Sequence, residues 1–140
     1  MLADLLVRIE ELGGDEVSPV VPIRLFFEGN DDEASFAPNL VPHPGMPNVY
    51  RVLSDIESRP EVSAVVVQID EVMEPPEWPF ASVVYVITSA DAAVVNEWAA
   101  AIEPDPPAPG DDDSTWLHGS VPPGAPHVPA RHRPVVLLWD

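Results

Sequence analysis

Four carboxylates gather in one ten-residue stretch of this 140-residue chain, the segment FFEGNDDEAS at residues 26–35. They are Glu28, Asp31, Asp32 and Glu33. Clustered carboxylate and carbonyl oxygens are ligands for Ca²⁺ and Mg²⁺. The spacing does not match a calcium loop of the form D-x-[DN]-x-[DN]-G with a later glutamate. A solvated turn, in which Gly29 or Asn30 takes a positive φ and an aspartate caps nearby N–H groups, is the simpler interpretation.

Histidine is the other metal-ligating residue type available, because the chain has no cysteine. The four histidines lie in Pro/Gly-rich sequence and lack the spacing of a zinc motif. If acids and histidines met in space, the candidate ligands would be Asp31, Asp32, Glu33, Glu74, His43 and His132. The sequence also contains neither a G-x-S-x-G elbow nor a phosphate-binding glycine loop. We therefore expect no cofactor and favour a non-enzymatic protein.

The net charge is strongly negative, since 24 acids face six cations, all arginine, for a formal charge of −18. Such a surface repels nucleic acid and attracts basic proteins. General acidity of the source proteome is a competing explanation. Trp78, between Glu77 and Pro79 in a predicted turn, is either an exposed interface residue or locally packed. The candidate partner-binding residues are Glu28, Asn30, Asp31, Asp32, Glu33, Glu74, Glu77 and Trp78.

The hydrophobic pattern predicts alternating helices and strands. Apolar stripes of helical period indicate helices over residues 2–12, between Pro47 and Pro60, and between Ser89 and Pro104. Short apolar or alternating runs indicate strands at 23–27, 62–71, 80–88 and 135–139. The second and third strands should pair as a hairpin across a Pro-rich connection.

This order predicts one α+β domain over residues 1–140, with a ferredoxin-like βαββαβ fold, an extra N-terminal helix and a Pro-rich connecting segment at 103–133. The right-handed crossover rule then gives an antiparallel sheet of order 4-1-3-2. In that topology residues 28–33, 71–79 and 131–133 converge on one rim. The acidic loop would thus lie beside the Trp78 turn and the clustered arginines.

One face of the predicted sheet needs a cover, because its outward side chains are also apolar. The first helix, the 103–133 segment or a second copy of the chain would supply it. The last alternative makes a homodimer a third functional hypothesis. Neither a signal peptide nor a spanning helix is expected, so a cytoplasmic protein is the default.

A resemblance to a known family rests on three segments, FFEGNDDEAS, NLVPHPG and EWPFASVVYVITS. They resemble an uncharacterised bacterial family in which a phenylalanine pair, a Gly-Asn-acid loop and a serine recur, in the form FF-x-G-N-D-D-x-x-S. The resemblance implies no activity, cofactor or catalytic residue. It implies that Gly29, Asn30, Asp31 and Ser35 matter. The leading hypothesis is an immunity- or antitoxin-like protein that caps a basic partner, and the alternative is a metal or small-molecule site at the same rim.

Overall fold

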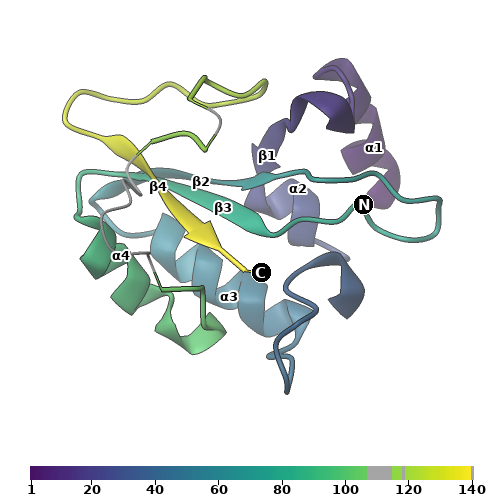
Figure 1. Cartoon of the computed structure of the whole chain (residues 1–140), viewed down its shortest axis with the longest axis horizontal. Coiled ribbons are helices and arrows are strands. Elements are labelled where there is room, and N and C mark those ends of the chain that lie inside the picture. The colour runs from purple at the N-terminus through teal and green to yellow at the C-terminus, as the bar shows by residue number, and fades with distance from the viewer. Residues whose placement is uncertain (107–114, 118, 140) are drawn as a thin grey trace.

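The computed structural model describes residues 1–106, 115–117 and 119–139, and it is a mixed α+β structure, as predicted. The α-helices within these residues are α1 (Leu2–Glu11), α2 (Ile23–Phe27), α3 (Met46–Glu57) and α4 (Ala92–Trp98) (Figure 1). The strands are β1 (Val20–Pro22), β2 (Val62–Gln68), β3 (Val83–Thr88) and β4 (Arg133–Leu138). Short 3₁₀ turns occur at Asp15–Val17, Glu33–Ser35 and Ala100–Ile102.

Helices α1 and α3 confirm the periodic pattern, and α4 forms where a helix was predicted but buries Val95 and exposes Val94. Helix α1 buries Leu5 and Ile9, one helical turn apart. Helix α3 carries Pro47 in its first turn, where a missing N–H costs no hydrogen bond. Its buried residues are Met46, Val49, Val52, Leu53 and Ile56. In the part of the chain that the structure describes, none of the helices has the length and apolar character needed to cross a bilayer.

The predicted strand at 23–27 is wrong, because these residues form helix α2. Ile23, Phe26 and Phe27 are buried at i, i+3 and i+4, whereas Arg24 points to solvent. A five-residue apolar run fits either structure on periodicity alone. The helical spacing lets both phenylalanines join the core, where the ring of Phe27 packs edge-on against that of Phe36 with centroids 5.3 Å apart. The strand lies just before, at β1.

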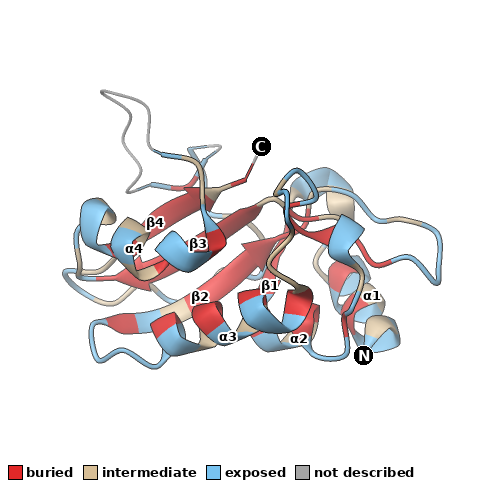
Figure 2. Ribbon diagram, turned by 90° about the horizontal axis from the view of Figure 1, so that it is seen from below, coloured by how far each residue is buried: buried red, intermediate tan, exposed pale blue. Residues whose placement is uncertain are grey.

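The sheet is an antiparallel meander of order β1-β2-β3-β4 and not the predicted 4-1-3-2. Loss of a strand at 23–27 removes the βαβ unit on which the ferredoxin-like order rested. The predicted hairpin is confirmed, with Val65 opposite Val86 and Gln68 opposite Val83. Strands β2 and β3 are therefore central, and β1 and β4 form the edges. Figure 2 shows these strands almost entirely in the buried colour.

The two faces of the sheet have different covers. Val65, Val67, Val84, Val86 and Leu137 pack with the helices in the larger core. The opposite face, with Val66, Tyr85 and Val136, is covered by residues 115–117 and 119–130, here called the strap. Trp116 of the strap packs edge-on against Tyr85, with ring centroids 4.7 Å apart. The chain's own Pro-rich segment thus supplies the cover, and α1, whose Leu5 and Ile9 belong to the helical core, does not.

Candidate functional site

The acidic loop, residues 28–33, is held by the buried side chain of Asn30. The Asn30 amide nitrogen donates to the Phe26 carbonyl at 3.3 Å and to the Ser35 hydroxyl at 3.0 Å. The Asn30 side-chain oxygen accepts from the Asp32 backbone N–H at 2.9 Å, and the Ser35 hydroxyl donates to the Asp32 carbonyl at 2.6 Å. Gly29 has φ +79°, the conformation expected for the turn. Asn30 and Ser35 are therefore scaffold residues, and their side chains are not available to a partner.

Asp32 links the acidic loop to the connection between β2 and β3. This connection, residues 70–80 and here called the arm, projects at the right of Figure 1. One Asp32 carboxylate oxygen accepts from the Ala34 N–H at 3.1 Å, and the other accepts from the Trp78 N–H at 3.4 Å. The predicted meeting of these two acidic segments is confirmed by this contact. Trp78 itself is only 8% exposed and belongs to the helical core, so the interface role predicted from its exposure is wrong and local packing holds.

The predicted convergence of residues 131–133 with this rim is also wrong. Arg133 lies opposite Thr88 in the β3–β4 pairing, at the other end of the sheet from the arm. Its guanidinium donates to Asp91 at 3.0 Å. His132 precedes it in the chain, with ring Nδ1 3.2 Å from the Ala130 carbonyl oxygen. The prediction paired β4 with the segment at 23–27, which would start β4 at the same end of the sheet as the acidic loop. In the structure β4 is antiparallel to β3, so it starts at the opposite end, beside Thr88.

His43 is the one candidate ligand histidine near the acidic loop, and backbone groups use both of its ring nitrogens. The Gly45 N–H donates to Nδ1 at 2.9 Å, so Nε2 carries the proton and donates to the Phe36 carbonyl at 2.8 Å. Glu33 approaches Nδ1 at 3.9 Å. Across residues 1–106, 115–117 and 119–139, no three His, Asp or Glu side chains gather closely enough to hold a metal ion. The candidate ligands Asp31, Asp32, Glu33, Glu74, His43 and His132 are thus not brought together as a set.

A pocket of 360 Å³ opens beside the acidic loop. It is lined by Phe27, Glu28, Gly29, Asn30, Asp31, Pro47 and Tyr50. The half-buried Tyr50 ring stacks on Phe27, with centroids 5.7 Å apart and an interplanar angle of 17°. Glu28 and Asp31 are exposed at its edge. The sequence did not single out Tyr50, because Tyr50 follows Val49 of the buried α3 stripe and carries no pattern of its own. Its stacking on Phe27 also requires residues 23–27 to be a helix, where the sequence predicted a strand.

Comparison with known proteins places the chain in a family. A family model described as the uncharacterised protein YfbO family matches residues 1–137. The chain belongs to the YfbO family. It is 32% identical to the uncharacterised protein YfbO of Escherichia coli (strain K12) over an alignment of 141 positions that covers 96% of each chain. No solved structure matches it significantly. The resemblance to an uncharacterised bacterial family is confirmed at this level.

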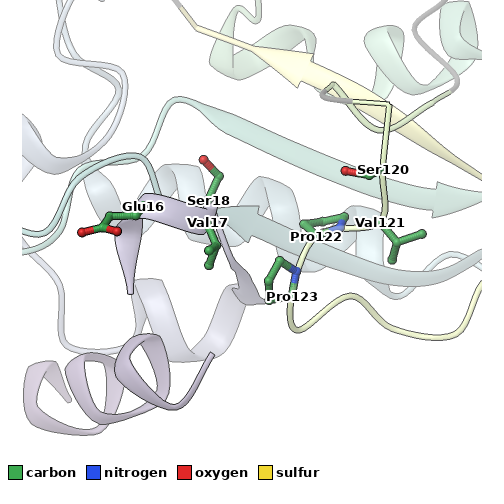
Figure 3. Close-up of a pocket in the computed structure, with 7 residues that line it drawn as sticks. All are labelled: Glu16, Val17, Ser18, Ser120, Val121, Pro122 and Pro123. Carbon is green, nitrogen blue, oxygen red and sulfur yellow. The ribbon is translucent and has the colours of Figure 1, made fainter. Parts of the chain in front are cut away.

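A second cavity of this YfbO-family protein, of 260 Å³, lies between the first 3₁₀ turn and the strap. Figure 3 shows Glu16, Val17 and Ser18 on one side and residues 120–123 on the other. Pro123 also ties the strap to the sheet edge, because its carbonyl accepts from the Val20 N–H at 2.9 Å. Among the described residues that line this cavity, only Glu16 is charged. The cavity therefore lacks the mixed aromatic and acidic lining of the pocket beside Tyr50.

A buried polar chain fixes the strap to the sheet. The Tyr85 hydroxyl donates to the Gln68 side-chain oxygen at 2.9 Å and accepts from the Leu117 N–H at 3.3 Å. The Gln68 amide donates to Asp70 at 3.0 Å, and the Ser82 hydroxyl donates to the other Asp70 oxygen at 2.7 Å. Burial raises the pKa of Tyr85 above the usual value of 10.0. Each side chain of this hydrogen-bonded network has a partner, so we assign the network a role in stabilising the fold.

Proposed function

We propose that this protein is a cytoplasmic, non-enzymatic binding protein that caps a basic protein partner with its acidic loop and arm, in the manner of an immunity protein or antitoxin. The observation that carries the proposal is the hydrogen bond between Asp32 and the Trp78 N–H, which joins the two segments. Their exposed carboxylates then form one surface. This acidic surface consists of Glu28, Asp31, Glu33, Glu74 and Glu77.

The charges of the acidic surface are largely free to act on a partner. Asp31, Glu74 and Glu77 make no ion pair within the described residues. Glu28 pairs with Arg24 at 3.7 Å, but both side chains are well exposed, and such a pair is weak. A surface of one sign speeds association with an oppositely charged protein and loses strength as salt rises. This behaviour suits rapid neutralisation of a basic partner.

The backbone beneath the acidic surface is fixed, which favours binding. The Asn30 and Ser35 side chains hold the loop, and the Asp15 carboxylate accepts from the Val72 N–H at 2.7 Å to hold the arm. A preformed surface loses less conformational entropy on binding than a mobile one. The partner therefore meets a loop and an arm whose backbones are already ordered.

The test is co-purification with the products of neighbouring genes at about 0.05 M and about 0.5 M salt. We expect a basic protein to be retained at low salt and released at high salt. The variant Asp31→Asn/Glu74→Gln/Glu77→Gln should lose it. The variant Glu10→Gln/Glu61→Gln/Glu97→Gln changes the net charge equally at exposed positions elsewhere and should retain it. Capture of no basic protein, or equal loss in both triple variants, contradicts the proposal.

A further inference from the structure

We propose that the pocket beside the acidic loop receives one arginine side chain of the basic partner. The proposal rests on the proposed function and adds the chemistry by which the partner is recognised. The pocket volume of 360 Å³ is at the low end of the range for ligand pockets, about 300–1,000 Å³. A single inserted side chain suits this size better than a large cofactor does.

The aromatic wall of the pocket supplies a stacking surface. Phe27 is buried, and the Tyr50 ring lies nearly parallel to it at 5.7 Å. Because Phe27 occupies one face of Tyr50, the tyrosine ring is held in one orientation where it borders the pocket. A guanidinium is planar and weakly hydrated, and it stacks on aromatic rings more readily than an ammonium does.

The acidic wall supplies the counter-charge. Asp31 is exposed, lines the pocket and makes no ion pair within the described residues. It lies between Asn30, which is 6% exposed, and Asp32, whose carboxylate oxygens accept two backbone N–H bonds. Both neighbours of Asp31 are therefore fixed, and they hold the backbone of Asp31 beside the pocket. A carboxylate and an arginine can form two parallel hydrogen bonds, which a lysine cannot reproduce.

Two of the pocket residues bring no polar side chain to it. Gly29 has no side chain, and the Met1 sulfur packs beside it, 2.9 Å from where a Cβ would lie. Pro47 cannot donate a backbone hydrogen bond and presents only its apolar ring. Gly29 and Pro47 thus form a small and apolar part of the pocket rim, beside the exposed carboxylates of Glu28 and Asp31. This arrangement matches the aliphatic stem of an arginine, with its charge at the end.

The experiment is a titration of the ¹⁵N-labelled protein with N-acetyl-arginine-amide, followed by amide chemical shifts. We expect saturable shifts at residues 28–31 and 50. N-acetyl-citrulline-amide, which has the same shape without the charge, should give none at equal concentration, and N-acetyl-lysine-amide should bind at least about threefold more weakly. Tyr50→Leu and Asp31→Asn should each weaken arginine binding at least about threefold, whereas Tyr50→Phe and the remote Glu97→Gln should not.

Several outcomes overturn the inference. They are shifts spread over unrelated residues, equal responses to arginine and citrulline, equal binding of lysine, or full binding by a folded Tyr50→Leu variant. The partner-capture assay separates this failure from failure of the proposed function. Capture that needs Glu74 and Glu77 but is unchanged in Tyr50→Leu overturns the arginine pocket and leaves the acidic surface standing. Absence of any salt-sensitive basic partner overturns both.

Discussion

Replacement of Asn30 by alanine is the sharpest test of how the acidic loop is built. The substitution removes three side-chain hydrogen bonds, to the Phe26 carbonyl, the Ser35 hydroxyl and the Asp32 N–H. The site is only 6% exposed, so water replaces these bonds poorly. Each bond contributes about 0.5–1.5 kcal/mol to stability. We expect the free energy of unfolding to fall by about 2–4 kcal/mol.

Urea unfolding followed by tryptophan fluorescence measures this loss. With a denaturant slope of about 2 kcal/mol per M, the midpoint should fall by about 1–2 M at unchanged slope. Asn39→Ala, at an exposed position, is the matched control and should change stability by less than about 0.5 kcal/mol.

A double-mutant cycle with Ser35→Ala isolates the bond between the two side chains. Its coupling energy should be about 0.5–1.5 kcal/mol, because the two residues share one hydrogen bond of 3.0 Å. A loss below about 0.5 kcal/mol for Asn30→Ala, or no coupling to Ser35, would refute the view that this network fixes the loop.

Three further predictions concern the strap and its sheet face. Folding raises the pKa of Tyr85 above 10.0, so the contribution of its neutral hydroxyl to the free energy of unfolding is complete below pH 10.0 and is lost as the pH rises through the folded-state pKa. Unfolding measured from pH 8 to 12 should show this loss of stability, and the loss should be smaller in Tyr85→Phe. Gly124→Ala should lower the free energy of unfolding by well over about 2 kcal/mol, because its Cβ would clash with the Val20 carbonyl oxygen. Gly119→Ala, also at positive φ but with open space around it, should lower it by about 1 kcal/mol. Chemical denaturation of the two variants separates the cost of a clash from the cost of backbone strain alone. Trp116→Ala should cost about 3–5 kcal/mol and increase hydrogen exchange in β3, and unchanged exchange would show that the strap does not protect the sheet.

Regular elements with strong periodicity were predictable from the sequence. Helices α1 and α3 follow apolar stripes that end at Gly13 and near Pro60, and the β2–β3 hairpin follows from two β-branched runs around a Pro-rich connection. The run at 23–27 failed because five apolar residues do not define a period. That one error replaced a meander with a ferredoxin-like order, since strand β1 has only three residues and carries no pattern of its own.

The candidate site was predictable only in part. The acidic loop and the Trp78 turn do meet, through Asp32, although the ferredoxin-like strand order from which their meeting was predicted is wrong. The burial of Trp78 and the stacking of Tyr50 on Phe27 depend on tertiary packing, which composition does not encode. The scaffold role of Asn30 and Ser35 agrees with the importance that the family resemblance implied for them, and its physical basis is hydrogen bonding within the loop.

The late position of the strap in the chain has a consequence for biosynthesis. Strands β2 and β3 leave the ribosome well before Trp116 and the residues that tie the strap to Val20. Until then, the Tyr85 face of the nascent hairpin is bare and its β3 edge lacks β4. Unpaired edges and uncovered apolar faces attract other chains. Translation pauses between residues 90 and 130 should therefore expose this protein to chaperone binding or aggregation more than pauses elsewhere.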